Sequence, residues 1–117
     1  MSAFNLNNIF VTGEITDVST ASSILIPIVD DMEGDVIDVT TVLGGALTTA
    51  DATVTVSKNT TSMGTITVAY TSSAAGDIDN LVPTSNNSLV AGDYLKIATD
   101  GGSTGTQTLG FVVTIRR

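Results

Sequence analysis

Apolar and polar residues alternate along much of this chain, most regularly at its C-terminal end. From Leu109 to Arg116 every second residue is large and apolar, and the residues between them are mostly small or polar. A period of two is typical of a half-buried β-strand. We therefore expect a strand whose inner face carries Leu109, Phe111, Val113 and Ile115, with Val112 as an apolar residue on the outer face.

The preceding segment has the same alternation, with Leu95 and Ile97 on one face and Tyr94 on the other. Between the two segments, residues 100–105 are polar and rich in glycine. Two alternating segments joined by such a stretch predict a β-hairpin. We expect this terminal hairpin to close the fold and residues 100–105 to form its exposed tip.

Similar segments recur about every eight to twelve residues, with Gly, Asn and Asp between them. The pattern predicts further strands at residues 9–16, 22–29, 35–43, 52–58, 64–71 and 88–90, and a single helical turn at 77–81. Strands 52–58 and 64–71 form the clearest hairpin. On the inner faces we expect Ile9, Val11, Ile15, Ile37, Val39, Leu43, Ala52, Val54, Val56, Ile66, Val68 and Tyr70. About eight short strands and no long helix predict an all-β protein, an antiparallel β-sandwich of jelly-roll type.

The 117 residues suffice for one domain, which we expect to span residues 9–117 after an N-terminal arm, residues 1–8, that a partner could order. Residues 1–13 carry no charge, and the arm includes Phe4 and Leu6. Phe10 falls on the polar face of the first strand. Two interpretations remain open: Phe10 packs beneath its own arm, or the arm and Phe10 together contact another protein.

The segment 22–29 is apolar on both faces, with Leu25 and Val29 opposite three isoleucines. Pro27 interrupts the segment, and proline cannot donate a hydrogen bond to a β-ladder. We therefore expect an edge strand or a bulged strand. An apolar edge tends to pair with other chains unless something covers it, and a subunit interface is one such cover.

The composition argues against several classes of function. The chain has no cysteine and no histidine, and its net charge of −8 is unsuited to binding nucleic acid or an anionic membrane. The N-terminus lacks the basic and apolar regions of a secretory signal. We expect a protein made in a cytoplasm, with no nucleic-acid, membrane or small-molecule partner, no cofactor and no enzymatic activity.

Two short stretches invite comparison with binding motifs. Five acidic residues lie between Asp30 and Asp38, but their spacing does not match the EF-hand calcium loop. The stretch from Gly101 to Gly105 is rich in glycine, but it lacks the lysine of a phosphate-binding loop. We expect a solvated turn and a flexible turn respectively, with no metal site and no catalytic residues.

Several phrases of the sequence resemble small capsid decoration (cement) proteins and related head proteins of tailed bacteriophages. These phrases are ADATVTV, GTITVAYTSSAAGDID, PTSNNSLVAGDYLKIATDGGSTGT and the closing RR. The resemblance covers residues 24–117. It implies a jelly-roll or similar β-sandwich that forms a homotrimer on the outside of the virion and clamps neighbouring subunits of the major capsid protein.

The neutral arm and the apolar edge suit contacts of this kind. We therefore expect a partner to bind at Phe4, Leu6, Phe10, Leu25, Val29 and Val112. The alternative is a carbohydrate- or receptor-binding β-sandwich of a phage head fibre or a tail-associated adhesin. That function needs an exposed aromatic platform or a calcium site, and Tyr94 is the best aromatic candidate.

Overall fold

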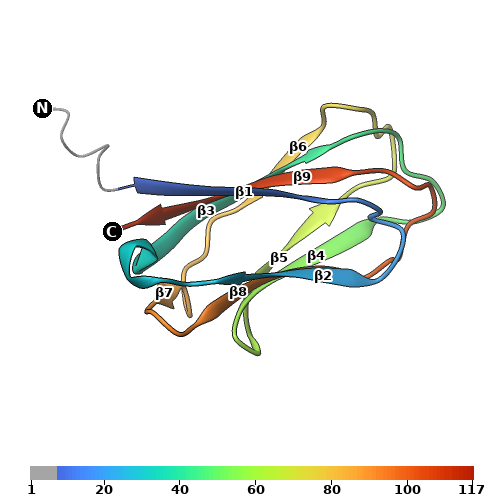
Figure 1. Cartoon of the computed structure of the whole chain (residues 1–117). Coiled ribbons are helices and arrows are strands. Elements are labelled where there is room, and N and C mark those ends of the chain that lie inside the picture. The colour runs from blue at the N-terminus through green and yellow to red at the C-terminus, as the bar shows by residue number, and fades with distance from the viewer. Residues whose placement is uncertain (1–7) are drawn as a thin grey trace, which may run out of the picture.

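A computed structural model describes residues 8–117, which form two antiparallel β-sheets packed face to face (Figure 1). The strands are β1 (Asn8–Ile15), β2 (Ser22–Pro27), β3 (Gly34–Leu43), β4 (Ala52–Lys58), β5 (Thr61–Val68), β6 (Ile78–Leu81), β7 (Ser88–Leu89), β8 (Tyr94–Thr99) and β9 (Leu109–Arg116). A 3-10 turn, η2 (Asp30–Met32), lies between β2 and β3, and the described residues contain no α-helix. Valine, isoleucine and threonine fill many strand positions, because their branched side chains favour an extended backbone.

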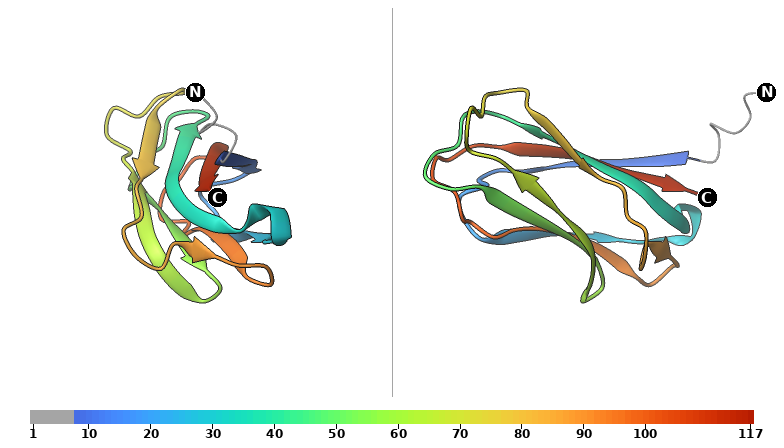
Figure 2. Two further views of the ribbon diagram at one scale, coloured as in Figure 1. Left: turned by 90° about the vertical axis from the view of Figure 1, so that its left-hand side faces the viewer. Right: turned by 180° about the vertical axis from the view of Figure 1, so that it is seen from behind.

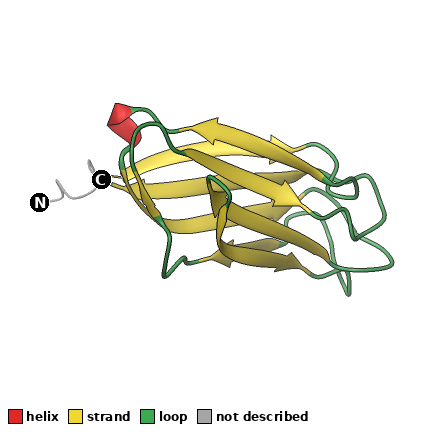
Figure 3. Cartoon of the chain, turned by 90° about the horizontal axis from the view of Figure 1, so that it is seen from below, coloured by secondary structure: helices red, strands yellow, loops and turns green. Residues whose placement is uncertain are grey.

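The strand order is that of a jelly roll. Sheet A has the order β1-β9-β3-β6, with the short β7 also paired to β3, and sheet B has the order β2-β8-β4-β5. Among these eight longer strands, each connection crosses from one sheet to the other except that between β4 and β5, which form a hairpin. Figures 2 and 3 show the two layers from other sides. The predicted antiparallel β-sandwich of jelly-roll type is confirmed.

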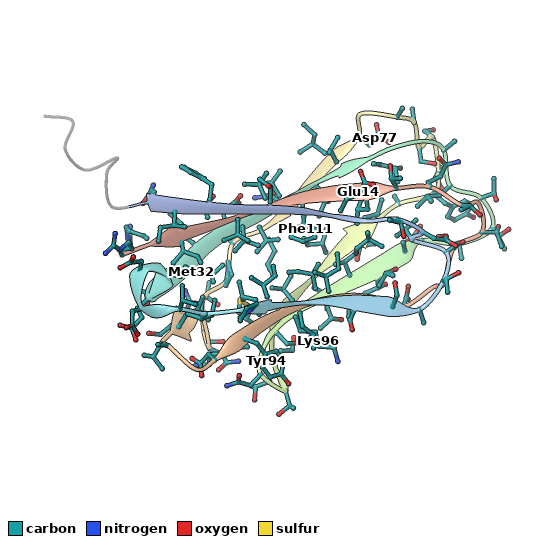
Figure 4. The ribbon with its side chains drawn as sticks, in the orientation of Figure 1. Glu14, Met32, Asp77, Tyr94, Lys96 and Phe111 are labelled. Atoms are coloured by element: carbon teal, nitrogen blue, oxygen red, sulfur yellow. The ribbon has the colours of Figure 1, made fainter. Side chains whose placement is uncertain are left out.

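The core lies between the two sheets and is made of alternate residues from both. The predicted inner face of β9 is confirmed, since Leu109, Phe111, Val113 and Ile115 are all buried. Sheet B contributes the inward residues of β4, β5 and β8, including Val54, Val56, Ile66, Val68, Leu95 and Ile97. Figure 4 shows Phe111 between the sheets and Tyr94 and Lys96 on the outer side of sheet B.

The predicted terminal hairpin is wrong. β8 lies in sheet B between β2 and β4, whereas β9 lies in sheet A between β1 and β3. Residues 100–108 therefore cross from one sheet to the other instead of reversing within one sheet. Jelly-roll wrapping places these two strands in opposite layers, so alternation in neighbouring segments was no indication that they pair with each other.

The same connection is not a free tip. Ser103 is buried, and Thr104 forms an isolated β-bridge with Thr48. The backbone N–H of Val18 also donates to the carbonyl oxygen of Gln107 at 2.9 Å. The expected exposed turn is therefore wrong at its centre, because the crossing segment packs on two neighbouring loops.

Three smaller predictions are also corrected. Ile37 is half-buried and Val36 is buried in its place, because a bulge between Val36 and Asp38 shifts the alternation by one residue. Tyr70 is exposed because β5 ends at Val68. The segment predicted as a helical turn is instead β6, which pairs with the second half of β3.

Of the two alternatives for residues 22–29, an edge strand or a bulged strand, the structure shows an edge strand, since β2 pairs only with β8 in the described structure. Leu25 is exposed on the outer side of this edge, and Val29 is exposed just beyond the strand. Ile28 between them is buried. Pro27 lies at the last position of β2, where the missing N–H costs the ladder least.

Candidate functional site

Exposed apolar side chains gather on the outer face of sheet A, called here the A face. They are Phe10 on β1, Val42 on β3, Ile78 on β6 and Val112 on β9, with exposed fractions of 63, 44, 69 and 37%. The strand registers place these residues in adjacent rows. Gly110 pairs with Val42, which pairs with Ile78, and the next row contains Thr12, Val112 and Thr40. Four strands thus supply one apolar surface.

This surface is hollowed around Gly110. The hollow has a volume of about 290 Å³ and is lined by Thr12, Gly13, Thr40, Thr41, Val42, Ile78, Gly110, Phe111 and Val112. It exists because Gly110 occupies an outward position with no side chain, between Glu14 of β1 and Val42 of β3. A Cβ atom at Gly110 would lie 3.2 Å from Cγ1 of Val42, which is a tight contact. A larger side chain at this position would therefore occupy part of the hollow.

The floor of the hollow depends on a second glycine. Gly13 faces inward on β1, and a Cβ atom there would lie 2.5 Å from Cζ of Phe111. The phenyl ring of Phe111 therefore occupies the space that a side chain at position 13 would need. A rigid core ring beneath the hollow keeps its floor in place.

Carboxylates flank the hollow on two sides. Glu14 is the direct cross-strand neighbour of Gly110 and is exposed on the A face. Asp38 accepts a hydrogen bond from Nδ2 of Asn80 at 3.0 Å and another from the hydroxyl of Thr40. These two bonds hold the Asp38 carboxylate beside the row that contains Thr40. Glu14 and Asp38 do not line the hollow, but they place negative charge near it on the A face.

The structure places the predicted contact residues on different surfaces. Phe10 and Val112 lie together on the A face, whereas Leu25 and Val29 lie on or just beyond the edge strand β2. Phe4 and Leu6 fall outside the described residues. Ile78 was not among the predicted contact residues, because its segment was interpreted as a helical turn. Val42 was not among them either, although this residue is apolar and alternates with the inward positions Thr41 and Leu43.

Most of the loop carboxylates whose pKa values are shifted accept hydrogen bonds that stabilise turns. Hydrogen bonds from the backbone of Thr53 and Gly102 lower the pKa of Asp100. Bonds from Val90 and Asn59 do the same for Asp93. In both residues the carboxylate closes a loop, which is a structural role.

Asp17 and Asp79 show opposite shifts. The hydroxyls of Ser19 and Thr20 donate to the Asp17 carboxylate and lower its pKa. Burial, together with the nearby charge of Asp77, raises the pKa of Asp79. Asp79 lies on the inward side of β6, opposite Thr41 of β3. Burial at this position disfavours the charged form of the carboxylate, which does not lie on the open A face.

The acidic stretch from Asp30 to Asp38 does not converge on one point. Glu33 accepts a hydrogen bond from the backbone of Ala91 at 2.7 Å, while Asp38 bonds to Thr40 and Asn80 on sheet A. Among residues 8–117, no group of three or more acidic side chains is arranged to hold a metal ion.

The aromatic residues of the described chain are also dispersed. Phe10 lies on the A face, and Tyr94 lies opposite Pro27 on the outer side of sheet B. Tyr70 is exposed in the loop after β5, and Phe111 is in the core. No two of these rings form a platform.

Comparison with known proteins gives similarity of fold alone. No protein-family model and no curated protein matches the sequence. The structure is similar to CsCBM6-3 from Clostridium stercorarium, solved in complex with cellobiose, with a TM-score of 0.56 and 14% identity over 95% of this chain and 83% of that one. It is also similar to part of dimeric latent PorU from Porphyromonas gingivalis, with a TM-score of 0.51 and 13% identity over 94% of this chain and 13% of that one. Across residues 8–117, no helix is long and apolar enough to cross a membrane.

Proposed function

We propose that this chain is a structural protein that attaches to an assembled protein shell, as a capsid decoration protein of a tailed bacteriophage. The observation that carries the proposal is the A face, where Val42, Ile78 and Val112 line a hollow and Phe10 is exposed two rows away from Gly110. Contiguous apolar surface on a folded domain is typical of a protein-binding site. The resemblance of residues 24–117 to decoration proteins supports the choice of a phage capsid as the shell.

The proposed mechanism is thermodynamic linkage. A protein that binds only the assembled lattice stabilises that state by mass action, without any chemical step. The partner is the major capsid protein, the site is the outside of the virion, and the attached form is a homotrimer. A jelly roll suits this role because its two packed sheets form a rigid surface. Little conformational entropy is therefore lost when that surface binds a partner.

The test uses undecorated capsids of the phage that encodes this chain. We expect saturable co-sedimentation of the purified chain with these capsids and a higher melting temperature of the decorated shell. Ile78→Lys places a charge on the A face and should weaken binding about tenfold or more. Val90→Lys changes another exposed apolar residue, 56% exposed in the loop after β7, and should bind as the wild type does.

Two outcomes would refute the proposal. One is a wild-type chain that does not bind the capsids at micromolar concentration. The other is unchanged binding of the Ile78 variant, which would remove the A face from the contact. Light scattering of the free and attached chain tests the homotrimer separately.

A carbohydrate-binding β-sandwich is the second candidate function. The similarity of fold to CsCBM6-3, which was solved with cellobiose, favours it. The dispersed aromatic rings of residues 8–117 favour it less, because a sugar ring stacks best on an exposed aromatic platform. Calorimetric titration with cellobiose tests this candidate. Binding that Tyr94→Ala abolishes and Ile78→Lys leaves intact would support it over attachment through the A face.

A further inference from the structure

We propose that the hollow around Gly110 is a pocket for one apolar side chain of a partner protein, and that Glu14 pairs with a lysine or arginine next to that side chain. This inference deepens the proposed function, on which it rests, by naming the chemistry that the A face recognises. The ligand is therefore a protein segment with an apolar residue beside a cation.

The shape of the hollow fits a side chain. Its volume of about 290 Å³ is enough for a leucine-sized or phenylalanine-sized group, and Val42, Ile78 and Val112 supply apolar walls. Phe111 lies beneath it, so an inserted group would contact a fixed surface. Burial of an apolar side chain against such walls is favourable, and the gain is largest when burial is complete.

The charges around the hollow point to a cationic neighbour. Glu14 stands directly beside Gly110, and Asp38 is held beside Thr40 on the other side. Along β9 the first cation on the A face is Arg116, six residues from Gly110, or about 20 Å in an extended strand. A partner that brings its own cation would therefore meet an uncompensated carboxylate.

A second copy of the chain is a poorer occupant. Each copy carries a net charge of −8. The register puts Glu14, Asp35 and Arg116 on the A face, where Asp38 adds a third carboxylate. Contact between two A faces would thus bring together more carboxylates than cations, and the resulting repulsion is unfavourable.

The test is an NMR titration of the whole chain with three matched peptides. The first is acetyl-Gly-Leu-Lys-Gly-amide, the second replaces its lysine by glutamine, and the third replaces its leucine by glycine. We expect saturable shifts of the backbone amides of Gly110, Val112 and Val42 with the first peptide. The second should bind about two- to fivefold more weakly, the range for an exposed ion pair. The third should bind at least about tenfold more weakly.

Two variants complete the test. Glu14→Gln changes an exposed residue. It should remove the preference for the lysine peptide over the glutamine peptide, while both leucine-containing peptides still bind. Gly110→Leu fills the hollow from the outer face and should abolish binding of the leucine peptides, with the rest of the amide spectrum unchanged. Because Gly110→Leu could disturb β9, the Glu14 variant decides the charge part alone.

The inference is overturned if the first two peptides bind equally well, or if their shifts lie away from the A face. Self-association of the wild-type chain through these same amides would overturn it in favour of a second copy. These results are independent of capsid co-sedimentation. A chain that binds capsids but ignores the peptides loses this inference alone, whereas a chain that binds no capsid loses the proposed function.

Discussion

Replacement of Phe111 by alanine tests the core and the A face together. The ring is 3% exposed and sits beneath Gly13, whose missing Cβ leaves room for Cζ of the phenyl group. Loss of a buried phenylalanine side chain costs about 3–5 kcal/mol, of which part is the cavity left behind. The ring points into the core between the two sheets, and the β1-β9-β3 ladder separates the new cavity from the A face. We therefore expect a cost of at least about 3 kcal/mol.

The assay is urea and thermal unfolding followed by circular dichroism. With an unfolding entropy of about 2.1 cal/mol/K per residue over 117 residues, a loss of about 3 kcal/mol lowers the melting temperature by about 12 °C. Val112→Ala is the matched control, since Val112 is the next residue of β9 and points to the outer face. We expect this control to cost less than about 1 kcal/mol.

A reversed order of the two effects would refute the assignment of faces. If Phe111→Ala were nearly neutral and Val112→Ala costly, β9 would have the opposite side toward the core. Equal and large losses would instead mean that the A face is buried in the free protein, as in a stable oligomer.

Two further predictions concern the crossing loop and the inward carboxylate. Gly101 has a φ of +71° and a Cβ atom there would lie 2.6 Å from the backbone nitrogen of Ala21, whereas Gly105, with a φ of +101°, has nothing nearer than 3.5 Å. Gly105→Ala should therefore cost about 1–2 kcal/mol and Gly101→Ala clearly more, as measured by urea unfolding, and equal costs would contradict the close approach of Gly101 to Ala21. Since burial raises the pKa of Asp79, its charge opposes folding at neutral pH, and Asp79→Asn should raise the urea midpoint at pH 7. The gain should disappear as the pH falls toward the ordinary aspartate pKa of about 3.9 and below, where both states of the wild type are protonated.

Alternation in the sequence predicted which way most side chains face, because the pleat of a strand imposes it locally. The inner faces of β4 and β9 and the outward position of Phe10 follow from residues two apart. A single bulge limits this reasoning. The extra residue at Ile37 reverses the phase of the first part of β3, and a one-residue irregularity has no composition of its own.

Strand partners were harder to predict, because they depend on contacts far apart in the sequence. A jelly roll puts its last two long strands in opposite sheets, so the expected jelly roll and the expected terminal hairpin excluded each other. The hollow has the same origin. Gly110 lies beside Val42 and Ile78 only through pairing between β9, β3 and β6, and no local pattern brings those three residues together.

The position of β9 has a consequence for how the protein is made. β9 pairs with both β1 and β3 at the centre of sheet A, yet it is synthesised after the other eight described strands. Until it emerges from the ribosome, β1 lacks its neighbour and β3 lacks one of its two main partners, and both expose unpaired backbone edges. Sheet A is therefore complete only once β9 is present, although β3 can pair with β6 and β7 without it. β1 and β9 pair only after the long stretch of chain between them has been closed into a loop. A chain that stops short of β9 would therefore leave the edges of β1 and β3 open to pairing with other chains and would be prone to aggregate.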